Sequence, residues 1–424
     1  MIMSEPLSDS PVPARATRRD EILDAAATLF AASGVRTSLK DIAEACGILP
    51  GSMYYYFESK EALIAELVSR YRADLDEIAQ HATKYRSADE PHQIEDRVIA
   101  FGRDIEACAS RHLAVLLMTM FEPPAGASGD LLRQTFETLE GVHAAMAELL
   151  RSGPGDAEVR PSVDHTLLAD RLCESMIRHS VAVADYQLGP DTRDLPDLRC
   201  RILLNGLALT PTNNSSLDHS AAFVSVASAI AGWRPCVGEN ERMTRLLAGA
   251  RSEFARRGYE VATLRQIAAA AGFNPGSVYR LFQSKRAMLD MIMENFARQR
   301  RKAWKGIMNS PSSPLEKLDA LLWLHIMLNE KFGEEIRIRF GFVREAPLGT
   351  RRDENAALLR EIARLLEEGI ACGEFRPVPF PLDMYARCVN EALWTPESVL
   401  RKIGPKRSYA LARDTVLSGA LMRN

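Results

Sequence analysis

The sequence lacks the cysteine pairs, catalytic signatures and long apolar runs that mark several common classes of protein. Its seven cysteines are scattered and none forms a C-x-x-C pair, which argues against a zinc site or disulfide framework and predicts a cytoplasmic location. No apolar run reaches the ~18 residues of a membrane span, and no signal-peptide core is found. No H-E-x-x-H, G-x-S-x-G or phosphate-loop pattern occurs, so we expect neither an enzyme nor a bound cofactor or metal.

Strong net charge and strand signals are also missing. The formal net charge is -3 over 424 residues, which gives no global attraction to nucleic acid or membrane, so DNA binding would have to rest on local features. Ala, Leu, Glu and Arg dominate, and apolar residues recur at helical spacing, which predicts an all-α fold. The length predicts more than one domain.

Two segments of the chain match each other at a long and nearly constant spacing. From Ile42 onward each equivalent residue lies 225 positions later, and upstream of the loop that begins at Gly34 the offset is 224. The identical pairs include Gly47 with Gly272, Gly51 with Gly276, Ser52 with Ser277, Tyr54 with Tyr279, Phe57 with Phe282, Ser59 with Ser284 and Lys60 with Lys285. A period this long indicates a duplicated domain rather than a solenoid of short repeats.

Each copy has the pattern of a helix-turn-helix unit. In the first copy an amphipathic helix over about 18–33 ends at Gly34, Ser38 can cap a second short helix, and Gly47 supplies the tight turn before a third. The third helix, over about 50–57, has a size that the major groove of DNA accepts, and hydroxyl groups lie near its start. These features predict a DNA-binding element in each half of the chain.

The motif D-I-A-x-x-x-G-x-x-x-G-S-x-Y-x-x-F-x-S-K, which begins at Asp41, resembles the signature of the tetracycline-repressor (TetR) family of bacterial regulators. Its spacing is intact from Ile42 and from Ile267, over roughly 45 residues in each copy. The resemblance implies a three-helix DNA-binding head on a larger helical body. In this family the body binds a small molecule and dimerises, usually through its last two helices.

Carried over by position, the resemblance also implies which residues contact DNA. In the first copy they are Ser38, Gly51, Ser52, Tyr54, Tyr55 and Lys60, and in the second copy Thr263, Gly276, Ser277, Tyr279, Arg280 and Lys285. Whether Tyr55 and Tyr56 face the groove or the core stays open. The first copy departs from the family pattern at Leu49, where a capping Ser or Thr is usual, whereas Asn274 and Pro275 begin the helix well in the second copy. We therefore expect a weaker start to the third helix of the first head.

Local charge separates the two copies. Residues 241–302 contain 13 Lys and Arg against 5 Asp and Glu, whereas residues 15–72 contain 8 of each. Only the second copy has the net positive charge that is typical of a DNA-binding domain. One explanation is that the first head is degenerate. The other, which we prefer, is that net charge does not show which face the charges occupy.

Two helical stretches carry His, Met and aromatic residues where the resemblance places the ligand cavity of the family, although such stripes usually belong to a core. The candidate pocket residues are His112, Met118, Phe121, His143, Trp323, His325 and Met327. If they line a pocket, the effector is hydrophobic or aromatic. Each histidine taken alone is otherwise a core or surface residue rather than a metal ligand.

The expected domains follow from the positions of the two motifs. They are a disordered arm (1–14), a first head (15–60), a first helical body (61–210), a linker (211–240) whose middle can form a short packed helix, a second head (241–285) and a second helical body (286–424). Body helices are expected over 61–82, 92–120, 128–152, 163–187 and 194–209, and over 286–308, 314–330, 333–343, 352–371, 381–401 and 406–422. Each body is long enough to bury a core of its own.

We interpret the chain as an all-α transcription regulator, a repressor that leaves its double-stranded operator when a small-molecule effector binds. The terminal helices of both halves predict an intramolecular pseudo-dimer, with further self-association of whole chains left open. The alternative is a ligand-binding or scaffold protein of the same fold, in which one or both heads have lost DNA binding.

Overall fold

The computed structural model describes residues 17–33, 37–85, 93–120, 139–151, 159–186, 194–210, 214–341 and 348–422. Within these ranges every regular element is a helix, and two isolated β-bridges join Val159 to Leu421 and Ala208 to Phe375. None of the described helices is long and apolar enough to cross a membrane. The all-α prediction is confirmed.

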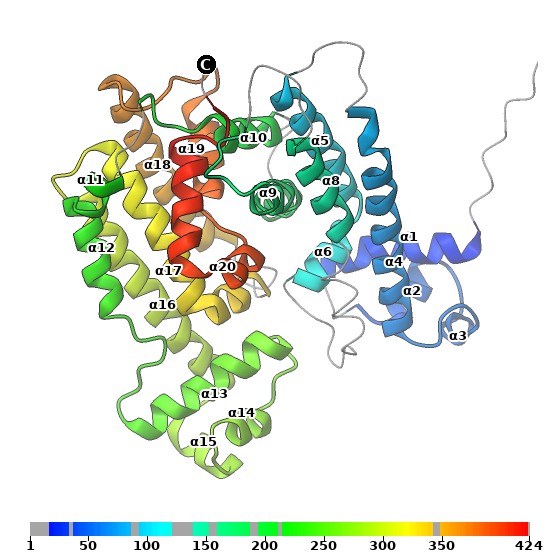
Figure 1. Cartoon of the computed structure of the whole chain (residues 1–424). Coiled ribbons are helices and arrows are strands. Elements are labelled where there is room, and N and C mark those ends of the chain that lie inside the picture. Colours follow the sequence, from blue (N-terminus) through cyan, green and yellow to red (C-terminus); the bar gives the residue numbers. More distant parts are fainter. Residues whose placement is uncertain are drawn as a thin grey trace, which may run out of the picture.

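The chain is built from two heads and two helical bodies (Figure 1). The first half contains α1 (Arg18–Ser33), α2 (Leu39–Ala45), η2 (Pro50–Ser52), α3 (Met53–Tyr56), α4 (Lys60–Gln80), η3 (His81–Tyr85), α5 (Ile94–Arg111), α6 (Leu113–Met120), α8 (Glu140–Arg151), α9 (His165–Tyr186) and α10 (Leu195–Asn205). The remainder contains α11 (Asn214–Asp218), α12 (Ala221–Ala231), α13 (Glu241–Arg257), α14 (Leu264–Ala270), α15 (Pro275–Leu281), α16 (Lys285–Met308), α17 (Pro314–Gly341), α18 (Leu348–Ala371), α19 (Leu382–Ala392), α20 (Glu397–Ala412) and η5 (Arg413–Leu417). The short helix expected in the linker is α12, which packs against α16 and α17.

One expected helix of the first body is divided in the structure, and a break expected in the second body is present as a kink. The stretch 92–120 is two helices, because His112 leaves the helical conformation with φ -102° and ψ 26°. The break expected between the stretches 314–330 and 333–343 is present within α17 as a kink at Phe332, which is non-helical with φ -123° and ψ 26°. A local kink at one residue therefore ends a helix in one half and only bends it in the other.

The expected terminal helices also have different bounds. The stretch 381–401 is interrupted before Pro396, because a proline disfavours helical backbone at the residue that precedes it. The stretch 406–422 is helical only as far as Leu417, and Gly419 then adopts a positive φ of 85°. The helix expected from residue 128 begins at Glu140 within the described part of the chain.

The duplication extends beyond the heads into the packing of the bodies. The ring of His112 lies 5.3 Å from that of Tyr71, and the ring of Phe332 lies 5.4 Å from that of Phe296, measured between centroids. Tyr71 and Phe296 are 225 positions apart, which is the offset seen in the heads. The two kinks are thus equivalent, although one half uses a polar pair and the other an apolar pair.

One continuous hydrophobic core runs through the first head and both bodies, whereas the second head has a core cluster of its own. The shared core includes Phe30 of the first head, Phe101 of the first body and Tyr385 of the second. The separate cluster surrounds Phe254 and Ile267. The two bodies therefore do not enclose separate cores, as their lengths would allow, but pack into one unit.

The two halves meet through α9 and α10 on one side and α19 and α20 on the other (Figure 1). Arg171 is buried and donates from Nη2 to the carbonyl of Ala392 at 2.5 Å, and from Nη1 to the hydroxyl of Thr395 at 3.2 Å. The Nζ of Lys402 donates to the buried carboxylate of Asp170 at 2.6 Å. Polar groups from one half are therefore satisfied by the other inside the interface.

The ends of the two bodies cross each other at the edge of this interface. Four backbone hydrogen bonds join them: Leu207 N–H to Val416 O (2.8 Å), Ala208 N–H to Leu417 O (2.9 Å), Ala420 N–H to Leu203 O (3.1 Å) and Leu421 N–H to Leu204 O (2.9 Å). The pattern is two-fold symmetric, because 207 corresponds to 420 and 203 to 416, both 213 positions apart. Each half thus contributes the same segment to the other.

Candidate nucleic-acid interface

The second helix of each head begins at a reciprocal capping pair. The hydroxyl of Ser38 accepts from the backbone N–H of Asp41 at 3.2 Å, and the Asp41 carboxylate accepts from the backbone N–H of Ser38 at 2.7 Å. Thr263 and Gln266 make the same pair at 3.3 and 2.9 Å. This capping fixes where the helices start. Ser38 and Thr263 therefore lie at positive helix ends, which favour a phosphate.

The third helices of the two heads start differently. Gly47 and Gly272 make the preceding turns with φ of 65° and 75°. In the second head the side chain of Asn274 accepts from the N–H of Ser277 at 3.1 Å, and α15 is a regular helix. In the first head Leu49 provides no cap, and a 3-10 turn precedes the four residues of α3. The weaker start predicted from Leu49 is present in the structure.

The outer face of each third helix presents aromatic or basic side chains. Tyr54 is 64% exposed and its equivalent Tyr279 is 67% exposed. Tyr55 is 87% exposed, and Arg280, which aligns with it, is also exposed. Tyr56 is half-buried against the core. Burial thus separates the two tyrosines that the sequence left open: Tyr55 lies on the surface and Tyr56 packs inward.

Both motif glycines lie on an open face. A Cβ added to Gly51 would meet nothing within 4 Å, and one added to Gly276 would meet only the Asn274 side chain at 3.6 Å. The packing of the heads therefore does not require glycine at either position. Absence of a side chain there leaves the backbone accessible to a close partner.

The remaining candidate residues differ in accessibility. Ser52 is exposed, but Ser277 is buried and its hydroxyl is hydrogen-bonded within the helix cap. The Nζ of Lys285 donates to three carbonyls of the loop 259–262, at 2.6, 3.1 and 3.2 Å. Lys60 lies over an aromatic ring of α1 at 5.7 Å. Both lysines hold α4 or α16 against its head, so a phosphate contact by either would be an additional role.

Charge on the first head cancels locally as well as in total. Arg18 and Arg19 of the first head pair with Glu21 and with Glu66 of α4, and Asp20 of the head pairs with Arg70 of α4. In the second head Arg242, Arg265 and Arg280 are exposed. The basic surface expected of a DNA-binding head is therefore more evident on the second head.

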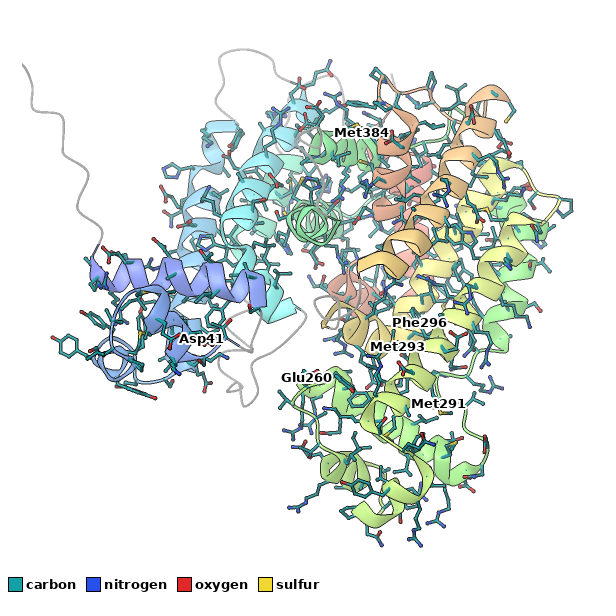
Figure 2. All side chains as sticks on the ribbon, turned by 180° about the vertical axis from the view of Figure 1, so that it is seen from behind. Asp41, Glu260, Met291, Met293, Phe296 and Met384 are labelled. Atoms are coloured by element: carbon teal, nitrogen blue, oxygen red, sulfur yellow. The ribbon has the colours of Figure 1, made fainter. Side chains whose placement is uncertain are left out.

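Long helices connect each head to its body, α4 in the first half and α16 in the second (Figures 1 and 2). Met293 and Phe296 lie where α16 passes from head to body, and Met293 packs against both core clusters. Nε of Arg251 on α13 donates to the buried carboxylate of Glu335 on α17 at 2.6 Å. This ion pair links α17 directly to the second head.

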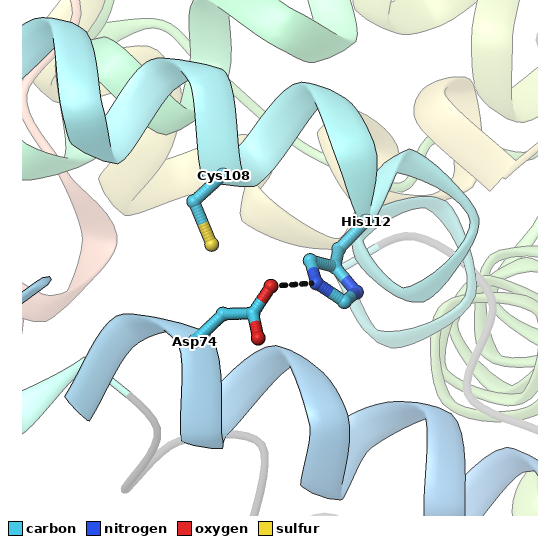
Figure 3. Close-up of side chains that lie close together, drawn as sticks. All are labelled: Asp74, Cys108 and His112. Carbon is cyan, nitrogen blue, oxygen red and sulfur yellow. Dashed lines mark hydrogen bonds and ion pairs between the residues drawn. The ribbon is translucent and has the colours of Figure 1, made fainter. Parts of the chain in front are cut away.

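Figure 3 shows the candidate pocket residue His112 beside Asp74 and Cys108, with one donor atom of each within 4.8 Å of the others. Nε2 of His112 lies 2.8 Å from Oδ2 of Asp74, which also faces the guanidinium of Arg111 at 3.4 Å. Burial raises the pKa of the Cys108 thiol to about 12, so the thiol is protonated at neutral pH. The group is a polar contact that joins α4 and α5.

The other candidates in the first body are only partly described. Nδ1 of His143 lies 2.8 Å from the buried carboxylate of Asp170, so this imidazole is engaged at the junction of the halves. The side chain of Met118 and the whole of Phe121 lie outside the described residues. Their assignment to a pocket stays a prediction.

The candidates on α17 pack among aromatic side chains. His325 is buried, with its ring 4.9 Å from that of Trp394, and its Nδ1 lies 2.8 Å from the carbonyl of Leu321. Trp323 is half-buried, 5.1 Å from the ring of Tyr409. Met327 is buried in the shared core. Their pocket role also stays a prediction.

A small cavity lies at the junction of the two halves, and none of the seven candidate residues lines it. Its walls include Arg171 on α9 and Arg199 on α10, together with Glu391, Ala392, Trp394 and Pro396. This cavity could not be predicted from the sequence, because its walls come from segments far apart in the chain. The available signal was the presence of arginines on helix faces that are otherwise apolar.

Comparison with known proteins agrees with the geometry of the heads. The chain matches the family described as bacterial regulatory proteins, tetR family, over residues 22–67 and 246–292. It is 34% identical over 164 residues to the HTH-type transcriptional repressor KstR2 of Mycolicibacterium smegmatis, covering 36% of this chain and 73% of that protein. It is 26% identical over 204 residues to the uncharacterized HTH-type transcriptional regulator YfiR of Bacillus subtilis, covering 42% and 93%.

Solved structures of similar proteins also match part of the chain. The ketosteroid transcriptional regulator KstR2 of Mycobacterium tuberculosis is 24% identical, with a TM-score of 0.37, and the match covers 45% of this chain and 100% of that one. The fatty acid degradation regulator FadR of Bacillus halodurans is 18% identical, with a TM-score of 0.35, and covers 47% and 98%.

The two repressor and regulator sequences each match less than half of the chain, as expected when one chain carries two units. The family consists of regulators rather than enzymes, and the first relative is a repressor. With two matched heads and a relative that is 34% identical over most of its length, the chain belongs to the tetR family of bacterial regulatory proteins and is a DNA-binding transcriptional repressor.

Proposed function

We propose that the chain binds its operator as a single-chain pseudo-dimer, with its two heads on two half-sites of one DNA duplex. The observation that carries this proposal is the two-fold crossing of segments 203–208 and 416–421. A two-headed grip normally needs two chains related by a two-fold axis. Here equivalent segments of one chain are related in that way, so a second chain is not required.

The buried contacts between α9, α10, α19 and α20 support the same proposal. The guanidinium of Arg171 and the carboxylate of Asp170 find their partners in the other half of the chain. The surfaces of these four helices are buried against each other, so a second chain cannot bind to them. The heads (15–60 and 241–285) and the bodies (61–210 and 286–424) accordingly act as the functional units of one molecule.

The third helices are proposed to enter successive turns of the major groove. Tyr54 and Tyr279 would donate their exposed hydroxyls to phosphates, and Gly51 and Gly276 would let the backbone approach the DNA. Arg280 is the residue we assign to base reading, because arginine donates two hydrogen bonds to guanine. Operator binding would place the protein in the cytoplasm, with the DNA.

A small molecule bound by the bodies would release the operator. Such an effector binds better to a conformation in which the spacing of the heads does not fit the operator. At saturation it lowers the affinity for the operator by the ratio of its affinities for the two conformations. The links from body to head through α16 and through Arg251 and Glu335 support such coupling.

A second candidate is a protein in which only the second head binds DNA. The first head favours it, because its arginines are paired internally and its third helix starts without a cap. In that case the first half would serve as a ligand-binding and supporting unit.

Footprinting on the intergenic DNA beside the gene of this protein tests both candidates. The pseudo-dimer predicts two protected patches, about one helical turn apart on one face of the duplex. A single protected patch would support the second candidate. No protection, together with no gel shift of the same DNA at low salt, would contradict both.

A further inference from the structure

Asp74, Cys108 and His112 form a group of potential metal ligands in the first body (Figure 3). Their side chains point toward one another from α4 and from the end of α5, and one donor atom of each lies within 4.8 Å of the others. Cys108 and His112 are four positions apart, so both project from the same face of α5. Sequence motifs do not predict this group, because Asp74 lies on a different helix from the other two residues.

The spacing of the three donor atoms is close to what one metal ion requires. Zinc binds nitrogen and oxygen at about 2.0–2.2 Å and sulfur at about 2.3 Å, so the donors around it are roughly 3–4 Å apart. Nε2 of His112 and Oδ2 of Asp74 are 2.8 Å apart, and Sγ of Cys108 lies within 4.8 Å of both ligand groups. Side-chain movements of about 1 Å would therefore bring all three donors into bonding distance of one ion.

The group combines a buried thiol with two ligands that solvent can reach. The side chain of Asp74 is 39% exposed and that of His112 is 16% exposed, whereas Cys108 is buried. Arg111 faces the same carboxylate at 3.4 Å, but its side chain is 60% exposed and can turn away into solvent. An ion can therefore enter from the side of Asp74. A thiol that binds zinc loses its proton, so binding would release one proton from Cys108 to solvent.

A further polar group beside the thiol has no partner in the protein. Tyr71 precedes Asp74 by one turn of α4, and its ring lies 5.3 Å from that of His112. Its buried hydroxyl has no hydrogen-bond partner among the described residues. Burial and the nearby thiols of Cys108 and Cys173 raise the pKa of Tyr71, so this hydroxyl stays a donor. The thiolate that metal binding creates at Cys108 would offer it an acceptor.

The second half of the chain provides an internal comparison. Phe332 occupies the kink that is equivalent to His112, and Leu328 lies four positions before it, where the first half has a cysteine. Gln299 corresponds to Asp74 at the offset of 225. The same kink is therefore built in the second half without any of the three potential ligands. The kink alone does not explain why the first half carries a carboxylate, a thiol and an imidazole together.

We propose that Asp74, Cys108 and His112 bind one Zn²⁺ ion through Oδ2, Sγ and Nε2, with water as the fourth ligand. Three protein ligands leave one tetrahedral position for water. A set of sulfur, nitrogen and oxygen donors fits zinc, whereas Mg²⁺ and Ca²⁺ take oxygen ligands. The bound ion would tie α4, which carries the first head, to the end of α5. Binding of the metal does not depend on the proposed function.

Co²⁺ and Zn²⁺ are the probes for this site, added to the full chain after a chelator has removed any metal. We expect one Co²⁺ per chain to produce the charge-transfer absorption of a thiolate ligand and the visible bands of a tetrahedral site. Zn²⁺ should displace it, release a proton and raise the unfolding midpoint. Mg²⁺ at the same concentration should do none of these. Absence of the thiolate band with Co²⁺, or an equal response to Mg²⁺, would overturn the proposal.

Variants of the chain locate the bound ion. His112→Phe places at this kink the residue that the second half uses, so the variant should fold and should bind metal at least about tenfold more weakly. Cys108→Ala should lose the charge-transfer band. Cys372→Ser and His81→Gln are the matched controls, because they remove an exposed thiol and an exposed imidazole outside the group. Both controls should bind metal as wild type does.

A thiolate band that persists in Cys108→Ala but is lost in Cys372→Ser would place the metal elsewhere and overturn the proposal. If His112→Phe does not fold, Asp74→Asn, which keeps the size of the side chain, carries the same expectation of weaker binding. A purely structural role predicts another result: His112→Phe would be less stable without metal, and Zn²⁺ would not change the unfolding midpoint of wild type. That result would also contradict the proposal.

Discussion

Gly206 and Gly419 lie against each other where the ends of the two bodies cross, and neither position has room for a side chain. A Cβ on Gly206 would lie 2.3 Å from the backbone nitrogen of Gly419, and a Cβ on Gly419 would lie 2.3 Å from the carbonyl carbon of Asn205. Both glycines have positive φ, 70° and 85°. Only glycine meets both conditions, so the crossing depends on this pair.

We expect Gly206→Ala and Gly419→Ala each to destabilise the chain strongly, because the added Cβ would push the crossing backbones apart. Gly373 is the matched control: its φ is 79°, but a Cβ there would meet nothing within 4 Å. Gly373→Ala should therefore lower the free energy of unfolding by only ~1–2 kcal/mol, which is the cost of placing a residue with a Cβ in left-handed backbone. Denaturant unfolding measures all three, and equal losses would show that the crossing tolerates a side chain.

Light scattering on the purified protein should report the mass of one chain. The reason is that the helices that would form an interface between chains, α9, α10, α19 and α20, already pack together within one chain. An obligate dimer whose main interface joins these helices from different chains would contradict the pseudo-dimer. Weak pairing of whole pseudo-dimers, which depends on concentration, would not.

Tyr54→Phe and Tyr279→Phe should each weaken binding to specific and unrelated DNA alike, by about tenfold. Both rings are mostly exposed, so removing the hydroxyl should leave the unfolding midpoint unchanged. A gel shift on operator and random DNA, beside a thermal melt, measures this. A lower melting temperature with intact DNA binding would instead show that the hydroxyls are structural.

The two halves of the operator should differ in sequence. A homodimer presents two identical recognition helices, whereas here exposed Tyr55 aligns with exposed Arg280. Arginine discriminates guanine by about 1–3 kcal/mol, and tyrosine has no comparable preference. We therefore predict that only the half-site under the second head requires a G·C pair.

Selection of binding sites from random DNA tests this asymmetry, using the native chain and Arg280→Ala. Loss of one base preference in the variant is expected. A perfect palindrome, or unchanged base preference, would contradict the prediction. If Arg280 contacts a phosphate instead, its loss should weaken binding to all sequences. It should also reduce the slope of log binding constant against log salt concentration by about one.

Stability should fall in mild acid because of the buried His325, whose pKa is lowered by burial to about 4, from 6.5. Its folded pKa lies below its unfolded pKa, so between these values the unfolded chain takes up a proton that the folded chain does not. Above about pH 6.5 the titration of His325 does not affect the free energy of unfolding. Below about pH 6.5 it lowers that free energy by about 1.4 kcal/mol per pH unit. His325→Phe should flatten the slope of unfolding free energy by that amount.

Unfolding curves between pH 7 and pH 4.5 measure the slope, where 4.5 stays roughly above the folded pKa. His219, which is exposed just after α11, provides the matched control, and His219→Gln removes an imidazole from the surface. An unchanged slope in His325→Phe would mean that this imidazole takes up its proton over the same pH range in the folded and the unfolded protein.

Much of each head could be predicted from local sequence. Ser38 and Thr263 as caps, Gly47 and Gly272 as turns, and the poor start at Leu49 all depend on residues within one or two helical turns. The helical fold and its duplication follow from the same short-range periodicity. Exposure of Tyr55 and burial of Tyr56 could not be predicted, because the helix is too short for its period to identify the inner face.

The sequence by itself determined the helices, the two heads and the family signature, since these arise from contacts between residues a few positions apart. Only the tertiary structure decided that the bodies share one core, that Gly206 meets Gly419, and that Arg171 and Arg199 line one cavity. These relations join residues that are far apart in the chain. They depend on how whole helices pack against one another, which no local pattern specifies.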